Sequence, residues 1–179
     1  MTDEMQSNPW PALSKDDEEL EKELFAMLAA RVSGDAYSED GSFAKELAKL
    51  PPGLRAMAAT HWLDISLTLD SITWHFGNFG EPGLVAQTEE GLMELGLLDL
   101  ASCFGEAKQL MLPLLARRTE ADGDPYEILE RKGLRETGQA LDNRASKLGE
   151  CNDGGKTKSA IYAAWVRYVR QHPERVFAS

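Results

Sequence analysis

Cysteine, histidine and long apolar runs are all scarce in this 179-residue chain. Its two cysteines, Cys103 and Cys151, lie far apart and outside any CxxC motif, so neither a zinc site nor a disulfide framework is expected. No segment approaches the roughly 20 apolar residues that a membrane span requires. The first residues also lack the basic segment and apolar run of a secretory signal. We therefore expect a cytoplasmic protein that does not bind membranes.

Basic residues are also few, with 19 of them against 30 acidic residues and a net charge of −11. The imbalance lies in residues 1–116, which hold twenty acidic and seven basic side chains, whereas residues 117–179 hold ten and twelve. The negative electrostatic field of this charge excess repels nucleic acid and anionic lipid, and it speeds the encounter with a basic protein surface. The same composition is also typical of soluble proteins without such a partner, and that alternative stays open.

Signatures of catalysis are weak. There is no GxSxG motif, and the segment from Asp153 to Thr157 resembles a phosphate loop but has Glu150 where that motif requires glycine. His61 and Asp64 lie one helical turn apart and could hold a metal or form an oriented base, joined by His75 only if the chain folds back. A hydrogen-bonded histidine at a helix packing boundary is the better explanation of the pair. We expect no cofactor, no metal and no enzyme activity, with a metal-dependent enzyme as a remaining alternative.

Apolar residues recur every three or four positions through most of the chain, which predicts helices. Together with the absence of a convincing strand pair, this pattern predicts an all-α fold with one compact domain of about eight helices over residues 14–179. Residues 1–13, which are polar and contain two prolines, are predicted to form a flexible tail, with the alternative that Trp10 and Leu13 pack onto the first helix. The expected helices cover residues 15–33, 42–50, 54–76, 84–95, 101–114, 125–132, 134–148 and 157–171.

The helix predicted from residue 54 to residue 76 contains an ambiguous segment. Residues 65–69 also alternate with a period of two and include β-branched side chains, so a break or an extended stretch is possible there. Asp70 would then cap a second helix. The first helix poses no such problem, because Ser14 and Asp17 resemble a capping box at its start.

The densest acidic cluster falls at the start of the first predicted helix. Carboxylates in a first helical turn are favoured by the helix dipole, and Glu18 can pair with Lys22, so a solvated helix face accounts for the cluster. Carboxylates three or four residues apart on a helix nevertheless stand about 5–6 Å from each other, a spacing not far from that of phosphates along nucleic acid. The cluster is therefore our candidate partner-binding surface, and it consists of Asp16, Asp17, Glu18, Glu19, Glu21 and Glu23.

Residues 50–177 contain a series of short motifs, from Leu50-Pro51-Pro52-Gly53-Leu54-Arg55 to a final Tyr168-Val169-Arg170-Gln171-His172-Pro173. In these motifs the chain resembles a bacterial family of small helical domains of largely unknown function that includes a dimeric, acidic DNA-mimic protein. The positions that match the family pattern are Leu63, Asp64, Phe76, Asn78 and Gly80. Where the family has a Gly-Gly pair, this chain has Asp70-Ser71, so the local structure there is not predicted by the resemblance.

The resemblance implies a helical protein that mimics DNA and can form a homodimer. Combined with the acidic charge, it predicts a non-catalytic binding protein whose partner is a basic protein, such as a transcription factor, rather than nucleic acid itself. An alternative is an immunity-type protein that neutralises a toxin, because many toxin nucleases are basic.

Overall fold

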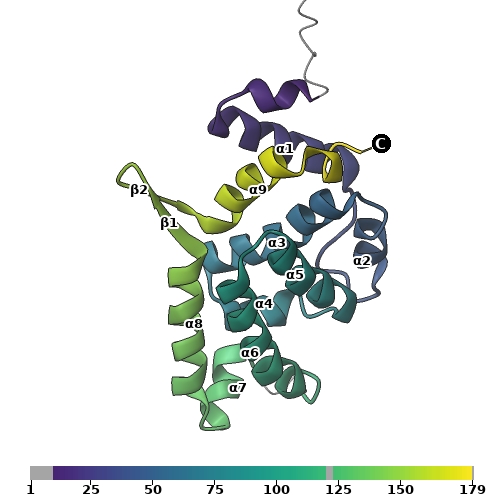
Figure 1. The fold of residues 1–179 in the computed structure, drawn as a ribbon. Helices are drawn as coiled ribbons and strands as arrows, with labels where there is room; N and C mark the ends of the chain where they lie inside the picture. Colours follow the sequence, from purple (N-terminus) through teal and green to yellow (C-terminus); the bar gives the residue numbers. More distant parts are fainter. Residues whose placement is uncertain (1–9, 120–122, 179) are drawn as a thin grey trace, which may run out of the picture.

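The computed structural model describes residues 10–119 and 123–178, which form nine α-helices and one two-stranded hairpin (Figure 1). The expected all-α fold is confirmed. The helices are α1 (Asp17–Arg31), α2 (Ser42–Leu47), α3 (Pro52–Leu69), α4 (Ile72–Asn78), α5 (Pro82–Glu94), α6 (Leu98–Leu115), α7 (Pro125–Arg131), α8 (Arg135–Gly149) and α9 (Ala160–Gln171). Short 3-10 helices at Pro11–Ser14 and Pro173–Arg175 flank them.

Helix α3 forms the centre of the fold, with α1 and α9 on one side and α4, α5 and α6 on the other (Figure 1). It buries residues on every face, including Leu54, Met57 and Leu63. The closest approach is at α5, where a Cβ on Gly91 would stand 3.0 Å from the carbonyl oxygen of Ala56. The absence of a side chain at Gly91 therefore allows the two helix backbones to pack closely.

The cap of α1 differs from the sequence-based expectation. Asp16 precedes the helix, and its carboxylate accepts a hydrogen bond of 2.9 Å from the Glu19 backbone N–H. Ser14 instead donates to the carbonyl oxygen of Pro11 inside the preceding 3-10 helix. The predicted Ser14 cap is wrong because this extra turn places Ser14 outside the helix start.

Alanine substitutions at these two positions should separate the two capping assignments. We expect Asp16→Ala to lower the free energy of unfolding by about 1 kcal/mol, because an N-terminal amide of α1 loses its acceptor. Ser14→Ala should change it by less than about 0.5 kcal/mol, as is usual for exposed positions. Urea denaturation of both variants measures the difference, and equal losses would contradict the assignment of Asp16 as the cap.

The predicted tail is too long at its C-terminal end. Trp10 stacks on Phe177 with ring centroids 5.6 Å apart, and Ala12 is buried in the first 3-10 helix. These contacts anchor residues 10–13 to the domain, so they do not form a flexible tail. Residues 1–9 of that prediction lie outside the described residues.

The prediction of one continuous helix over residues 54–76 is wrong, because the chain breaks between α3 and α4. Residues 65–69 remain helical, and the break falls at Asp70, whose φ and ψ are −146° and −108°. Ser71, not Asp70, caps α4 by accepting a hydrogen bond of 3.3 Å from the Trp74 backbone N–H. The extended alternative is wrong because the helical period keeps both Leu63 and Ser66 buried.

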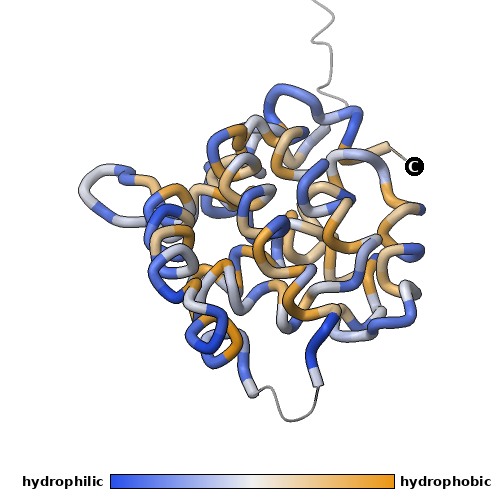
Figure 2. Tube along the Cα trace, turned by 90° about the horizontal axis from the view of Figure 1, so that it is seen from below, coloured by the Kyte–Doolittle hydropathy of each residue, from blue (hydrophilic) through white to orange (hydrophobic). Residues whose placement is uncertain are grey.

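A β-hairpin follows α8, where the sequence pattern predicts no strands. Strands β1 (Glu150–Asp153) and β2 (Lys156–Ser159) pair antiparallel and project from the body of the domain (Figures 1 and 2). Gly154 and Gly155 form the two-residue turn with φ values of 58° and 84°, the left-handed values that such hairpins require. The glycine pair is a sequence signal for a hairpin turn. The strands beside it are polar and lack the apolar alternation that predicts a strand.

Candidate functional site

The acidic cluster on α1 is largely neutralised by its own neighbours. Asp17 pairs with Arg170 of α9, Glu18 pairs with Lys22 at 2.8 Å, and Glu23 pairs with Lys15. The hydrogen bond from Lys22 lowers the pKa of Glu18. Half of the six predicted carboxylates are therefore engaged in ion pairs within the chain.

The other three carboxylates of the cluster do not form a uniform row either. Asp16 caps the helix, as described above, and Glu19 is exposed. Glu21 is partly buried, and this burial raises its pKa. The cluster therefore presents fewer uncompensated charges than its sequence indicates.

His61 and Tyr162 of α9 both lie close enough to Asp64 for its charge to affect their pKa values. The Nδ1 atom of His61 lies 3.0 Å from the hydroxyl oxygen of Tyr162 on α9. Burial and the nearby Asp64 carboxylate raise the pKa of Tyr162, and this carboxylate accepts a hydrogen bond from the Ser159 hydroxyl. Burial lowers the pKa of His61, so its ring is neutral at neutral pH. Tyr162 and Ser159, about one hundred residues away in sequence, could not be assigned to this group from sequence spacing.

His75 lies apart from this pair. It is fully buried, its Nδ1 atom is 2.9 Å from the Ser66 hydroxyl, and its ring packs against Phe76, Phe79 and Phe104. Within the described part of the chain, no three His, Cys, Asp or Glu side chains are arranged to hold a metal ion. In this structure His61, Asp64 and His75 therefore do not form the metal site considered for a metal-dependent enzyme.

The positions that match the family pattern divide between the core and one surface cavity. Leu63 and Phe76 belong to the hydrophobic core, and Asp64 binds Ser159. Asn78 and Gly80 line a cavity of about 670 Å³ between the end of α4 and the end of α6. A Cβ at Gly80 would stand 2.4 Å from the carbonyl oxygen of Phe76, so this turn excludes other residues.

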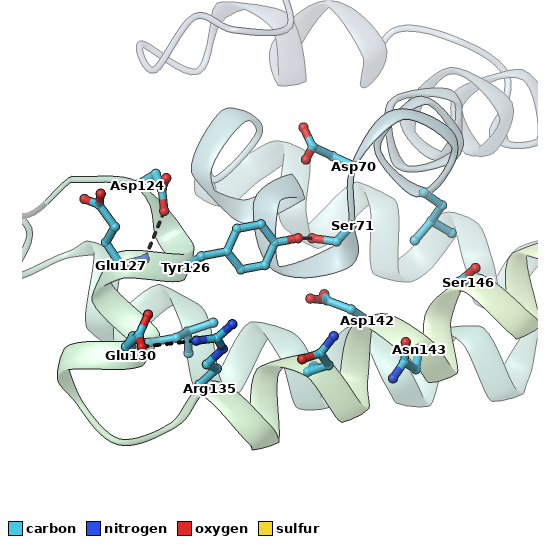
Figure 3. Close-up of a pocket in the computed structure, with 13 residues that line it drawn as sticks. Asp70, Ser71, Asp124, Tyr126, Glu127, Glu130, Arg135, Asp142, Asn143 and Ser146 are labelled. Atoms are coloured by element: carbon cyan, nitrogen blue, oxygen red, sulfur yellow. Dashed lines mark hydrogen bonds and ion pairs between the residues drawn. The ribbon is translucent and has the colours of Figure 1, made fainter.

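A second cavity, of about 520 Å³, opens between the α3–α4 junction, α7 and α8 (Figure 3). We call it the acidic cleft, because five carboxylates and a single arginine line it. They are Asp70, Asp124, Glu127, Glu130, Asp142 and Arg135. Arg135 pairs with Glu130 at 3.1 Å, so its charge is already compensated. The wall of the cleft also includes the aromatic ring of Tyr126 and the aliphatic side chains of Leu67 and Leu129.

Hydrogen bonds fix the inner wall of the acidic cleft. Tyr126 donates to the Ser71 hydroxyl at 2.8 Å, and Ser71 in turn lies 3.1 Å from the hydroxyl of Thr73. The carboxylate of Asp142 accepts from the backbone N–H and the hydroxyl of Thr73, at 3.0 and 3.1 Å. Figure 3 shows Asp142 pointing toward Tyr126 and Ser71. This wall is therefore preorganised by contacts between α4, α7 and α8.

Asp142 is the central charge of the acidic cleft. Burial raises its pKa, whereas the hydrogen bonds from Thr73 act in the opposite direction. Its hydrogen-bond partners from Thr73 are neutral, so they do not compensate its charge when it is ionised. One hint of this site was present in the sequence, because Asp70-Ser71 stands where the family that the chain resembles has two glycines. Asp124 and Asp142 are too distant in sequence to be associated with it.

Comparison of the chain with protein-family models, with curated proteins and with solved structures finds no match. The resemblance of residues 50–177 to a family that includes a DNA mimic therefore stays a prediction. The described residues also contain no helix long and apolar enough to cross a membrane.

Proposed function

We propose that the protein is a non-catalytic acidic binding protein that occupies the basic surface of a nucleic-acid-binding protein, as a DNA mimic does. The acidic cleft is the observation that carries this proposal. It concentrates five carboxylates around one cavity, and only one of them has a basic partner in the cavity wall. A concave site of one charge sign focuses the electrostatic field and favours a partner of opposite charge.

This proposal moves the binding surface away from α1. Charges that are already paired contribute little to the attraction of a partner, because their fields largely cancel at a distance. On α1, Glu18 and Glu23 are paired in this way, whereas the ion pairs among the described residues include neither Asp142 nor Asp70 of the acidic cleft. The cleft is also held rigid by Ser71 and Tyr126, which reduces the entropy lost on binding.

The proposal can be tested by affinity capture from a nuclease-treated bacterial lysate, at low and high salt, with mass spectrometry of the retained proteins. We expect a basic DNA-binding protein that is released by salt and displaced by duplex DNA. Capture of a basic toxin would favour the immunity-type alternative. If no basic protein is retained at low salt, the proposed function is wrong.

Two matched triple variants then locate the binding surface on the captured protein. The cleft variant carries Asp70→Asn, Glu127→Gln and Asp142→Asn, and the α1 variant carries Glu18→Gln, Glu19→Gln and Glu21→Gln. Each removes three charges, so long-range attraction falls equally. We expect the cleft variant to bind at least about tenfold more weakly, because it loses direct contacts, and the α1 variant to lose less than about threefold. If the α1 variant loses more affinity than the cleft variant, the binding surface lies on α1.

A further inference from the structure

Large apolar side chains are exposed beside the acidic cleft. Five such side chains are exposed among the described residues, and two of them lie here. Leu69 is 78% exposed and directly precedes Asp70 of the cleft wall, and Tyr126 is 43% exposed and lines the cavity itself. Exposed apolar side chains with a charged rim are typical of a surface that binds another protein. This property of the cleft is independent of its charge.

The ring of Tyr126 is held in place from two sides. Its hydroxyl donates to Ser71 at 2.8 Å, and Trp74 of α4 meets the ring at 72°, with centroids 6.1 Å apart. Figure 3 shows the ring reaching across the cleft from α7 to Ser71, with Asp142 of α8 directed toward it. A fixed aromatic ring and a carboxylate, carried by different helices, therefore lie at the same cavity.

The spacing of the carboxylates favours a broad cation. Within the part of the chain that the structure describes, no three His, Cys, Asp or Glu side chains are arranged to hold a metal ion, so the acidic groups do not converge on one point. A guanidinium group suits such a site, because it is planar, carries five N–H donors and stacks on aromatic rings. An ammonium group is a compact, strongly hydrated point charge. The cavity of about 520 Å³ is as large as sites that hold small-molecule ligands, so it has room for a complete arginine side chain.

We propose that the acidic cleft receives an arginine side chain of the partner protein. Its guanidinium group stacks on the ring of Tyr126 and donates to the carboxylate of Asp142, while Leu69 contacts an apolar side chain beside that arginine. Thr73 occupies two of the roughly four acceptor sites of the Asp142 carboxylate, which leaves room for this bond. The proposal rests on the function proposed above, since it names the group by which the cleft recognises a basic partner.

Two tripeptides test the choice of cation, acetyl-Gly-Arg-Gly-amide and acetyl-Gly-Lys-Gly-amide. Each carries one positive charge, so the field of the cleft attracts them alike. Binding to the full chain at low salt is followed by the NMR signals of the Tyr126 ring. We expect the arginine peptide to shift these signals and to bind about fivefold more tightly than the lysine peptide, because its guanidinium group stacks on the ring. Equal affinities, or Tyr126 signals that do not move, would overturn the proposal.

Two pairs of variants test the geometry with the same peptides. Tyr126→Leu should abolish the preference for arginine, whereas Tyr126→Phe, which keeps the ring, should retain it. Asp142→Asn should weaken binding of the arginine peptide at least about fivefold, because a charge-assisted hydrogen bond is lost. Glu136→Gln is the matched control and should change it less than about twofold, since Glu136 is exposed on the same helix outside the cavity wall. A preference that survives Tyr126→Leu contradicts the stacking, and equal losses at Asp142 and Glu136 contradict the contact with Asp142.

The apolar contact is tested on the protein captured from the lysate. Leu69→Ser should weaken its binding at least about threefold, because an exposed side chain at the cleft loses its partner contact. Leu98→Ser should leave binding unchanged, since Leu98 is 65% exposed but lies at the start of α6, outside the cavity wall. Equal effects of the two substitutions would show that no apolar contact forms at Leu69.

Failure of this proposal can be distinguished from failure of the proposed function. If a basic protein is captured but the two tripeptides bind alike, the proposed function stands and arginine recognition is wrong. If the arginine peptide binds with the stated preference but no basic protein is captured, arginine recognition by the cleft stands and the proposed function is wrong.

Discussion

Replacement of Trp165 by alanine is expected to lower the free energy of unfolding by about 4 kcal/mol, within the range for deletion of a large buried aromatic side chain. Trp165 on α9 is completely buried. Its ring packs against Phe25 of α1 at 5.2 Å and against Tyr162 at 4.8 Å, and its indole N–H donates to the Thr60 hydroxyl of α3 at 3.1 Å. The ring therefore joins three helices, and its removal leaves a cavity where they meet.

Urea denaturation followed by circular dichroism measures this loss. Thr60 retains its hydrogen bond to the carbonyl oxygen of Ala56 at 2.8 Å, so the effect is mainly that of lost packing. Leu98→Ala is a suitable control, since Leu98 is 65% exposed and should change stability by less than about 1 kcal/mol. A loss at Trp165 no greater than that at Leu98 would show that α9 does not depend on this contact.

The second large effect is expected on acidification, through His75. Burial among aromatic rings lowers the pKa of His75 from 6.5 to about 3 in the folded protein. The unfolded chain therefore binds a proton below pH 6.5 that the folded chain does not bind. Stability contributed by the neutral ring is complete above pH 6.5 and is lost as the pH falls toward 3. The loss amounts to about 1.4 kcal/mol for each pH unit.

The variant His75→Phe isolates this contribution. Phenylalanine suits the aromatic surroundings, and the Ser66 hydroxyl keeps its bond to the Trp62 carbonyl oxygen at 3.0 Å. Between pH 6.5 and 4.5, the wild-type protein should lose about 2 to 3 kcal/mol more stability than the variant. Denaturation midpoints across this pH range provide the comparison, and the carboxylates act alike in both proteins. Parallel pH profiles would mean that His75 is protonated in the folded state.

Part of the site chemistry was recognisable in the sequence. Residues one helical turn apart share a helix face, which predicts that His61 and Asp64 lie together, and the structure adds Tyr162 beside His61 and Ser159 beside Asp64. The positions of Ser159 and Tyr162 beside this pair were not predictable, because the two residues reach it only by the packing of α9 on α3. The acidic cleft could not be predicted for the same reason, since Asp70, Asp124 and Asp142 belong to three separate segments.

The sequence by itself determined the all-α class and the approximate position of most helices, because helical periodicity is a local property of neighbouring residues. Helix caps were less well predicted, since Asp16 and Ser71 rather than Ser14 and Asp70 make the capping bonds. Only the tertiary structure decided which charges are compensated. The pairing of Asp17 with Arg170 joins residues 153 positions apart, and such distant contacts determine where a negative field remains for a partner.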